Sequence, residues 1–430
     1  MAGSAGGSRK SSLLMRILVV HQHYLLPGDP GGSRFNEFAR LWQKAGHDVT
    51  VICGTLNYST GQTPPELRGR WVRRREEAGV PVWRCHVPPA YGRSYLGRMW
   101  AFFCFALSSA TAVLRSGPAD VVIATSPPLT VALTGWLAGR WHRAPWVFEI
   151  RDLWPESAIT TGTVRAGSLL AGLLHRVECF ACARSARIVV LTPAFVEDLV
   201  ARRLRRREDI SLVPNGADLD TFVPGPRENE VRRRFEWGDR FVALYAGAHG
   251  RANAPMQLVA AAEHLRDRPD ILIVTVGDGS ERAECEAAAS ARGLSNIAFL
   301  GAQPKTAMPA FVNAADTGIA VLQDNATFRT VYPNKVFDYM ACERPTVLAI
   351  DGVARSLVCE EAQAGVYTPP EDAAALAGAL RRLADDRDLA RTLGRNGRAW
   401  AIAHASRASL AARYLQILWA LRRDGHCGQV

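Results

Sequence analysis

A twofold alternation of short β-branched runs and longer helical stretches is the feature that most constrains the fold of this chain. Stretches such as 35–46, 255–266 and 281–293 are rich in Ala, Leu and Arg and have helical periodicity. The runs predicted as buried strands are 16–21, 48–53, 120–124, 145–150, 187–191, 210–213, 241–246, 271–276, 297–300, 317–321 and 345–350. Because strands that alternate with helices form βα units, the sequence predicts an α/β protein with parallel sheets.

Length and turn signals divide the chain into domains. A chain of 430 residues has room for two or three domains of ~150 residues each. The segments PNGADLD and VPGP carry turn signals between the two sets of strands. We predict a disordered lead over 1–14, a Rossmann-like domain over 15–212, a linker over 213–226, a second Rossmann-like domain over 227–395, and helices over 396–424 that close the second domain or pack back across the first.

Composition excludes several classes of protein. Apolar residues make up 48% and charged residues 22% of the chain, which is typical of a globular protein and excludes disordered, collagen-like and coiled-coil chains. The formal charge is 52 − 41 = +11, and only four of the basic residues are lysines. This surplus favours anionic partners, although an arginine-biased genome explains it equally well.

Cysteine usage and hydropathy indicate the compartment. The nine cysteines are odd in number and lack disulfide-like spacing, which indicates a reducing compartment. Cys179 and Cys182 form a lone CxxC that fits helical spacing better than a metal site. Residues 13–20 are too short for an export signal and are expected to form the first strand. Since no uninterrupted apolar stretch reaches the ~18 residues of a transmembrane helix, we expect a cytoplasmic protein.

A glycine-rich loop follows the first predicted strand. The strand ends at His21-Gln22-His23, and PGDPGGSR (27–34) then leads into a helix. Such a loop before a helix N-terminus is the usual anion site of open α/β sheets, because glycines let the backbone approach the ligand. Arg34 would add positive charge. An ordinary tight turn is the alternative, since the loop lacks the GxGxxG pattern.

Residues 327–345 contain the most informative motif. Pro333 fits the start of a helix, which places Asn334 and Lys335 in the first turn. Backbone N–H groups, the helix dipole and one lysine would converge there, and this arrangement suits a diphosphate. Asp338 lies one turn further along, where a carboxylate can accept hydrogen bonds from both hydroxyls of a ribose. The sequence therefore predicts a site for a diphosphate and a ribose.

Two other motifs follow predicted strands. GDGS (277–280) is either a phosphate contact or a plain βα turn, and we group its Gly277 and the strand-end Gly247 with the donor site.

The segment FEIRDLWPES (148–157) ends a buried strand of the first half. It carries Glu149, Arg151, Asp152 and Glu156 where charged residues face the ligand crevice of this fold class. An arginine–carboxylate pair that braces the loop is the alternative.

Taken in order, these motifs resemble glycosyltransferase family 4, the retaining nucleotide-sugar transferases of GT-B architecture. The resemblance covers residues 15–420 and is greatest for the fucosamine-transferase-like enzymes of O-antigen and capsule assembly. It rests on PGDPGGSRFNEFARLWQKAGHDVTVI, TSPPL, RDLWPES, VPNGADLDTF, GDGSE and PNKVFDYMACERP. The implied fold is two Rossmann-like, doubly wound domains that face a central cleft.

The resemblance implies a nucleotide-sugar donor held mainly by the second domain, with no metal ion and no other cofactor. Asp338 stands at the second glutamate of the family's EX7E motif, which contacts ribose, and Thr330 replaces the first glutamate. Arg151 stands where many relatives carry a histidine near the reacting sugar. Gly31 and Gly32 match the glycine pair near the donor phosphates.

The resemblance bears on two pairs of acidic residues, one in the RDLWPES motif and one in the VPNGADLDTF motif. Asp152 and Glu156 match the subgroup's own pattern. Asp218 and Asp220 look like a metal-binding DxD, but in this family that stretch is an inter-domain strand and linker. We therefore assign no metal to it.

Three segments bear on membrane contact. Residues 97–115 hold four aromatic residues between arginines and form either a buried helix or an interfacial one with aromatic anchors. Residues 164–176 are similar, and the basic run 202–207 would favour anionic lipid. In the resembling subgroup the acceptor is a polyprenyl-diphosphate-linked saccharide, which fits a protein peripheral to the inner face of the cell membrane.

The main hypothesis is a retaining glycosyltransferase that moves a sugar from a UDP-linked donor onto a lipid-linked saccharide. Predicted catalytic residues are Arg151, Asp152, Glu156 and Lys335, and predicted donor-binding residues are Gly31, Gly32, Arg34, Gly247, Gly277, Arg329, Asn334, Lys335 and Asp338. A GT-B nucleotide-sugar epimerase and a non-catalytic assembly partner stay open. Nucleic-acid binding fits poorly, because the arginines are spread without an aromatic stacking platform.

Overall fold

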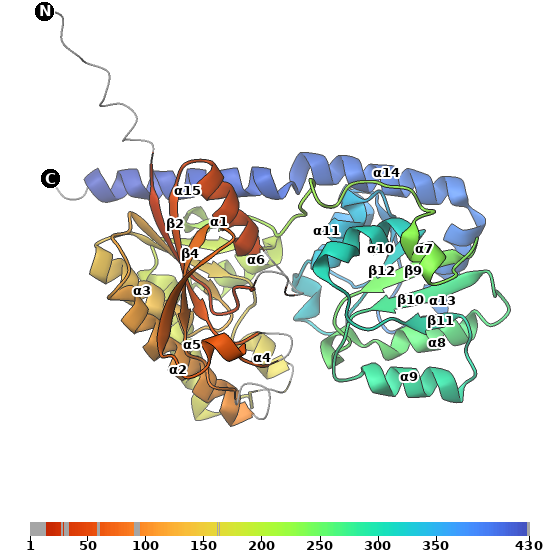
Figure 1. Cartoon of the computed structure of the whole chain (residues 1–430), viewed down its shortest axis with the longest axis horizontal. Coiled ribbons are helices and arrows are strands. Elements are labelled where there is room, and N and C mark those ends of the chain that lie inside the picture. The colour runs from red at the N-terminus through yellow and green to blue at the C-terminus, as the bar shows by residue number, and fades with distance from the viewer. Residues whose placement is uncertain are drawn as a thin grey trace, which may run out of the picture. The chain divides into compact units, whose positions relative to one another are not determined.

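The structure is a computed structural model that describes residues 14–26, 29, 34–57, 61–89, 95–160, 162 and 164–427. The chain divides into two compact units (Figure 1). The first comprises Met1–Leu191, Phe195–Val213 and Ala411–Val430, and the second comprises Thr192–Ala194 and Pro214–Leu410. Apart from Leu14, the predicted lead 1–14 lies outside the described residues.

The first unit is built on an eight-stranded sheet with the order β3-β4-β2-β1-β5-β6-β7-β8. The strands are β1 Arg16–Val20, β2 Asp48–Gly54, β3 Val72–Glu77, β4 Val80–Cys85, β5 Val121–Ser126, β6 Trp146–Ile150, β7 Arg187–Val190 and β8 Ile210–Leu212. Neighbours pair in parallel except in the hairpin β3–β4. Because β2 and β5 flank β1, the carboxyl ends of β1 and β5 form a topological switch point.

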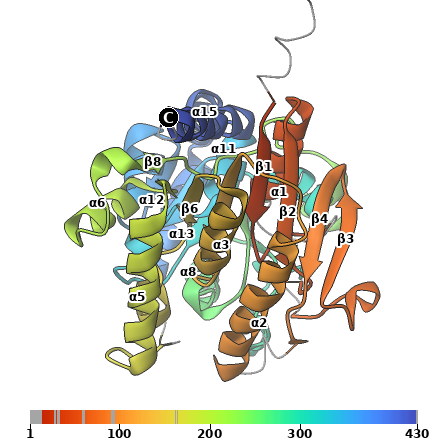
Figure 2. The same cartoon turned by 90° about the vertical axis from the view of Figure 1, so that its left-hand side faces the viewer.

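Helices cover both faces of this sheet. They are α1 Arg34–Lys44, α2 Tyr95–Val113, α3 Val131–His142, α4 Glu156–Thr160, α5 Leu169–Arg184 and α6 Pro193–Ala201. The crossovers through α2, α3 and α5 advance across the sheet in one direction and the crossover through α1 in the other. Right-handed connections therefore put α2, α3 and α5 on one face, where Figure 2 shows them side by side, and α1 on the opposite face.

The hairpin of β3 and β4 was not predicted from the sequence. Ala78 and Gly79 form its two-residue turn, and both have positive φ (51° and 79°), as a type I′ turn requires. On β4, Arg84 is 1% exposed and pairs with Glu77 of β3 at 2.5 Å. Another N–H group of Arg84 donates to the carbonyl oxygen of Tyr24 at 2.9 Å. The buried pair thus holds the loop that follows β1.

The chain from Ala411 onward belongs to the first unit. Its residues 411–427 lie in α15, Arg407–Cys427. The indole Nε1 of Trp42 donates to the carbonyl oxygen of Ala411 at 2.9 Å. The rings of Phe35, Phe38, Trp42 and Tyr414 form one buried aromatic cluster between α1 and α15. Aromatic side chains bury a large area each, so this cluster ties the end of the chain to the first unit.

The second unit is built on a six-stranded parallel sheet with the order β11-β10-β9-β12-β13-β14. Its strands are β9 Phe241–Ala246, β10 Ile271–Val276, β11 Ile297–Phe299, β12 Thr317–Val321, β13 Thr346–Ala349 and β14 Gly365–Tyr367. Its helices are α7 Glu230–Arg234, α8 Met256–His264, α9 Arg282–Ala291, α10 Met308–Ala314, α11 Asn334–Ala341, α12 Val353–Arg355, α13 Ala373–Asp385 and α14 Arg387–His404. Because β10 and β12 flank β9, a second switch point lies at the carboxyl ends of β9 and β12.

The observed strands confirm the predicted α/β class. All eleven predicted strands are present with ends shifted by at most two residues. The strands that the sequence did not predict are β3, β4 and β14.

Residues 214–226, the predicted linker apart from its first residue, pack onto the second unit. Ala217 and Phe222 belong to its buried core. Asp218 accepts hydrogen bonds from the backbone N–H groups of Asp220 and Thr221, so its carboxylate closes a turn. In the described part of the chain, no three or more His, Cys, Asp or Glu side chains gather as a metal site would require.

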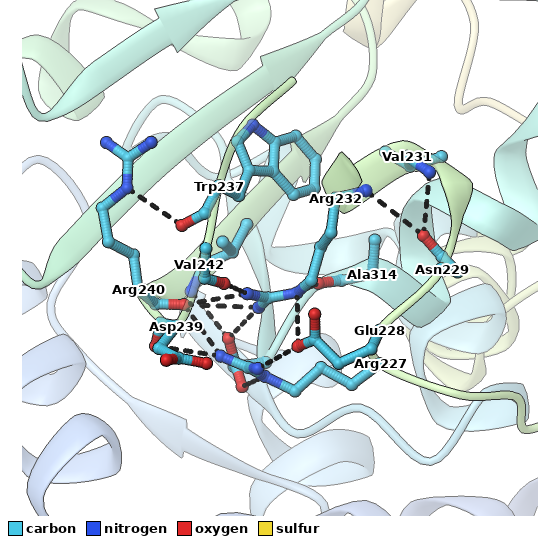
Figure 3. Close-up of polar contacts among 12 residues, drawn as sticks. Arg227, Glu228, Asn229, Val231, Arg232, Trp237, Asp239, Arg240, Val242 and Ala314 are labelled. Atoms are coloured by element: carbon cyan, nitrogen blue, oxygen red, sulfur yellow. Dashed lines mark hydrogen bonds and ion pairs between the residues drawn. The ribbon is translucent and has the colours of Figure 1, made fainter. Parts of the chain in front are cut away.

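An ion-pair network centred on Asp316 lies at the amino edge of the second sheet, and Figure 3 shows the side chains of Arg227 and Arg232 with their contacts. Asp316 directly precedes β12 and is 8% exposed. Its carboxylate accepts hydrogen bonds from Arg232 Nη2 at 2.6 Å, Arg227 Nε at 2.7 Å and Arg387 Nη1 at 2.9 Å. The backbone N–H of Val242 on β9 donates to the same carboxylate at 2.8 Å. One carboxylate therefore joins the segment before α7, α7 itself, α14 and β9.

Candidate active site

Helix α11 begins where the sequence predicts a diphosphate site. Pro333 occupies its N-cap position, as expected. The helix follows β12, so its N-terminus lies at the carboxyl edge of the sheet beside the switch point. The Tyr339 hydroxyl donates to the carbonyl oxygen of Leu244 at 3.1 Å and accepts from the N–H of Ala246 at 3.0 Å. These bonds hold α11 against the end of β9.

The ammonium of Lys335 lies at the end of β9. Its Nζ is 3.7 Å from the centroid of the Tyr245 ring and 2.8 Å from the position that a Cβ atom would take on Gly247. The ammonium is buried without a hydrogen-bond partner, although the residue as a whole is partly exposed. Burial lowers the pKa of Lys335 to about 7. A buried ammonium without an acceptor is costly, so this position would gain from an anionic partner.

Glycines let the loops after β9 and β10 pack backbone to backbone. A Cβ atom on Gly277, whose φ is +145°, would lie 1.8 Å from the carbonyl oxygen of Gly247, and one on Gly279 would lie 2.5 Å from the carbonyl carbon of His249. The N–H of Gly247 donates to the carbonyl oxygen of Val276 at 2.8 Å. Gly277 therefore has a packing reason to be glycine, and its predicted contact with the donor stays a prediction.

His249 is a residue of this site that the sequence analysis missed. It is 1% exposed, and neither ring nitrogen has a hydrogen-bond partner. Its ring meets the Tyr245 ring edge to face at 5.4 Å. Burial lowers the pKa of His249, and the charge of Lys335 lowers it further. The one available signal was its place two residues after Gly247, at the carboxyl end of a buried strand.

Asn334 and Arg329 are partly engaged by other side chains. Asn334 Oδ1 accepts from Asn215 Nδ2 at 2.6 Å. The Arg329 guanidinium is half exposed and lies 2.9 Å from the carboxylate of Asp324. A Cβ atom on Gly352, whose φ is +76°, would lie 2.1 Å from the carbonyl oxygen of Arg329, so that glycine permits the close approach of this loop.

The two positions of the EX7E pattern have different surroundings. Asp338 lies one turn after Asn334 on α11 and is partly buried. Helical spacing puts it on the same side of α11 as Asn334 and Lys335. Thr330 donates its hydroxyl to the carbonyl oxygen of Thr327 at 2.7 Å. Its side chain therefore closes its own turn.

In the first unit, the ends of β1 and β6 bring His21 and Arg151 together. Arg151 Nη1 donates to His21 Nε2 at 3.1 Å. Burial lowers the pKa of His21 well below its usual value, and the charge of Arg151 adds to this effect. The imidazole is therefore neutral, accepts at Nε2 and carries its proton on Nδ1.

Asp152 adjoins this pair, whereas Glu156 lies apart from it. Burial raises the pKa of Asp152 to about 6, and the Arg151 guanidinium opposes part of that shift. Glu156 begins α4, and its partly exposed carboxylate lies 3.6 Å from Nε2 of His175 on α5. The structure thus groups Arg151 and Asp152 with His21 and places Glu156 beside α5.

Arg34 is buried in the first unit, with 2% of its side chain exposed. Its Nη2 donates to the carbonyl oxygen of Val213 at 2.9 Å and lies 3.5 Å from the carboxylate of Glu149, which is fully buried. The charge that Arg34 was expected to offer the donor is thus already paired with Glu149. Gly31 and Gly32 lie outside the described residues.

The two units match two glycosyltransferase families. Residues 31–216 match the glycosyl transferase 4-like domain, and residues 227–400, which include the Lys335 site, match the glycosyl transferases group 1. The chain is a glycosyltransferase. The first match confirms the resemblance to family 4 over residues 31–216, and the second shows a group 1 glycosyltransferase domain over residues 227–400.

Curated relatives of this glycosyltransferase carry related names. The putative colanic acid biosynthesis glycosyl transferase WcaI of Escherichia coli is 25% identical over 377 residues, which cover 86% of this chain and 92% of that protein. The probable glycosyltransferase WbjE of Pseudomonas aeruginosa is 23% identical over 369 residues, which cover 85% of this chain and 88% of that protein.

Solved structures confirm the GT-B fold of this glycosyltransferase. Anabaena HepE in complex with UDP is 18% identical, with a TM-score of 0.70 and coverage of 94% of this chain and 100% of that one. WaaG, a glycosyltransferase involved in lipopolysaccharide biosynthesis, is 17% identical, with a TM-score of 0.65 and coverage of 94% and 99%.

Proposed function

We propose that this glycosyltransferase moves a sugar, with retention of configuration, from a UDP-linked donor to a polyprenyl-diphosphate-linked saccharide in surface polysaccharide or O-antigen assembly. The observation that carries the proposal is the buried ammonium of Lys335, which lies without an acceptor beside Gly247 at the start of α11. HepE, which was solved with UDP and with UDP-glucose, supports the donor class. The name of WcaI and the resemblance to fucosamine-transferase-like enzymes support the acceptor class.

The chemistry of the proposed site follows from where negative charge develops. When the bond between the sugar's anomeric carbon and the diphosphate breaks, the departing diphosphate gains charge. The positive end of the α11 dipole and the ammonium of Lys335 would stabilise that charge. Asp338, one turn along the same side, would accept hydrogen bonds from the ribose hydroxyls. The proposal needs no metal ion.

We assign to the first unit the residues that act on the reacting sugars. Neutral His21 fixes the Arg151 guanidinium by accepting its hydrogen bond. Asp152, with a pKa of about 6, is mostly ionised at neutral pH and can accept a hydrogen bond from a sugar hydroxyl. Glu156 is the least supported of the predicted catalytic residues, since it faces His175.

A thermal-shift panel of UDP, GDP, ADP, CMP and their sugars tests the proposal. A ligand at a hundred times its Kd adds ~2.7 kcal/mol of stability, which raises the unfolding temperature by several degrees for a domain of this size. We expect a shift with UDP and UDP-sugars. The absence of a shift with every nucleotide would overturn the proposal.

Asp338→Ala is expected to raise the KM for the donor by roughly ten- to a hundredfold, because a hydrogen bond to a charged acceptor contributes ~1.5–3 kcal/mol. The value of kcat should change less, since the ribose does not react. Steady-state kinetics with varied donor would measure both constants. An unchanged KM would remove Asp338 from the donor site.

Donor affinity is expected to fall as the pH rises above about 7. In the free protein the pKa of Lys335 is about 7, and a bound diphosphate favours the charged ammonium, so binding takes up a proton. The loss should approach about tenfold per pH unit above 7, because the protein must first recover that proton. The pKa of His249, whose charged form Lys335 disfavours, is lowered, so His249 stays neutral in this window. Calorimetry with UDP in buffers of different ionisation enthalpy would detect the proton, and Lys335→Met should abolish it.

Thr330 favours a second candidate, a non-catalytic assembly partner, because its hydroxyl closes its own turn where the family's motif has a glutamate. Such a protein would show no transfer with any donor. A nucleotide-sugar epimerase would instead invert C2 of the donor without an acceptor, which NMR of the donor alone would reveal.

A further inference from the structure

Exposed apolar side chains gather on the helices that share one face of the first sheet. They are Trp100, Phe103 and Leu107 on α2, Leu133 and Trp136 on α3, and Leu169 and Leu173 on α5, with 36% to 96% of each residue exposed. On α2 the spacing of three and four residues forms one stripe, and the rings of Trp100 and Phe103 stack at 5.7 Å. α3 contacts both α2 and α5 (Figure 2). A contiguous apolar patch indicates an interaction surface.

Chain connectivity places this patch at the carboxyl edge of the sheet. α3 begins shortly after β5 ends, so its first turns lie at that edge. α2 ends shortly before β5 begins, and α5 ends shortly before β7 begins, so the first turns of both helices lie there too. His21, Arg151 and Asp152 follow β1 and β6 and therefore occupy the same edge. The patch thus adjoins the proposed sugar-binding residues of the first unit.

The hairpin of β3 and β4 adds positive charge at this edge. Val72, which begins β3, pairs with Cys85, which ends β4, and β3 contacts α2. The arginines at 68 and 70, which lead into β3, and at 73 and 74 on β3 are exposed, and none of them has an acidic partner in the described ranges. They are called below the four hairpin arginines. Among them stands Trp71, which is 46% exposed and stacks on the His86 ring at 5.8 Å.

The basic run 202–207 was expected from the sequence to attract anionic lipid. Four of its five arginines form ion pairs within the protein, and Arg203 has none in the described ranges. Arg202 pairs with Glu178 and Asp198, Arg205 with Asp209, Arg206 with Glu208 and Asp209, and Arg207 with Glu197. These ion pairs leave little net charge for a lipid headgroup. The four hairpin arginines, at 68, 70, 73 and 74, lack such acidic partners in the described ranges, and their hairpin is one that the sequence did not predict as a structural element.

We infer that the carboxyl-edge rim of the first unit, made of the apolar residues of α2, α3 and α5 with Trp71 and the four hairpin arginines, rests on an anionic phospholipid bilayer. Exposed tryptophans and leucines suit the headgroup boundary, and arginines beside them suit lipid phosphates. The inference rests on the proposed function, because the bilayer contact would bring the enzyme to a polyprenyl-linked acceptor held in that bilayer. No helix in the described ranges is both long and apolar enough to cross a membrane.

Flotation of the full-length protein with vesicles tests the inference. One set of vesicles is phosphatidylcholine alone, and the other contains phosphatidylglycerol as well. We expect binding to the anionic vesicles, a loss of at least about tenfold in Arg70→Glu/Arg74→Glu, and a loss on both vesicle types in Trp100→Ser/Phe103→Ser. The matched control Arg206→Glu/Arg207→Glu changes the net charge equally but replaces two arginines that form ion pairs within the protein, so it should bind as the parent protein does.

Three results would overturn the inference. They are no binding of the parent protein to either vesicle type, equal losses in the two charge-reversal variants, and light scattering that shows the rim joining two copies of the chain. The UDP-induced thermal shift, which reports on the second unit, should persist in every variant. A circular-dichroism spectrum and melt like those of the parent protein show that the first unit of each variant folds. If that shift is absent while the vesicle pattern appears, the proposed function fails and the bilayer contact stands.

Discussion

Replacing Lys335 with methionine is expected to lower kcat by roughly 10²- to 10³-fold and to make the free protein more stable. The first effect follows because one preorganised donor of positive charge at a developing anion is worth about that factor. The second follows because the ammonium is buried without an acceptor, whereas a methionine of similar length fills the same space without that cost. Activity and stability should thus move in opposite directions.

The pH dependence of stability checks the second effect. Unfolding returns the pKa of Lys335 from about 7 to its ordinary value of 10.5, so the unfolded chain binds more protons between those values. Stability of the parent protein should therefore rise with pH across that window. The gain should be on the order of a few kcal/mol and absent in the methionine variant. Thermal melts between pH 7 and pH 10 would show the difference.

Lys44 supplies the matched control for this prediction. It is an exposed lysine in the last turn of α1, so Lys44→Met removes the same charge without affecting the proposed site. That variant should keep the parent kcat. Full activity in Lys335→Met would instead show that the diphosphate is stabilised elsewhere.

Sequence patterns predicted this fold wherever strands are buried on both faces. β1, β5 and β6 are buried along almost their whole length and are mostly apolar, because helices cover both sides of the sheet. β3 escaped prediction because its sequence, VRRREE, is that of an exposed edge strand. Its hairpin is specified instead by the Ala78-Gly79 turn and by the burial of Arg84 against Glu77. The charged sequence of β3 by itself indicates neither the turn nor the buried ion pair.

The sequence predicted the helix that carries the candidate site, but it did not predict the contacts that surround the site. Pro333, Asn334 and Lys335 mark the start of α11 in the sequence itself. That the Lys335 ammonium lies against Gly247 depends on Tyr339, which fixes α11 to β9 across more than ninety residues of chain. His249 and the pairing of Arg34 with Glu149 depend on similar long-range packing. Local patterns cannot show which neighbours tertiary structure will supply.

Asp316→Asn is expected to destabilise the second unit by about 3–5 kcal/mol, the usual loss when one partner of a buried ion pair is removed. The carboxylate accepts from three arginines and from Val242. One of them, Arg232, is only 1% exposed and would lose its charged partner. At ~2–4 °C per kcal/mol for a unit of this size, the unfolding temperature should fall by roughly 10 °C. Calorimetry or circular dichroism would measure the shift.

Asp388→Asn is the control for that result, because the Asp388 side chain is 89% exposed in its pair with Arg391 and surface pairs contribute little. Asp316 precedes β12, whereas Lys335 lies beyond its carboxyl end, so the two act at opposite edges of one sheet. At temperatures where it stays folded, Asp316→Asn should therefore keep the parent affinity for UDP. If folded Asp316→Asn loses affinity for UDP, the ion-pair network positions α11 as well as stabilising the unit. If the affinity is retained, donor binding at the carboxyl edge of this sheet does not depend on the ion pairs that stabilise its amino edge.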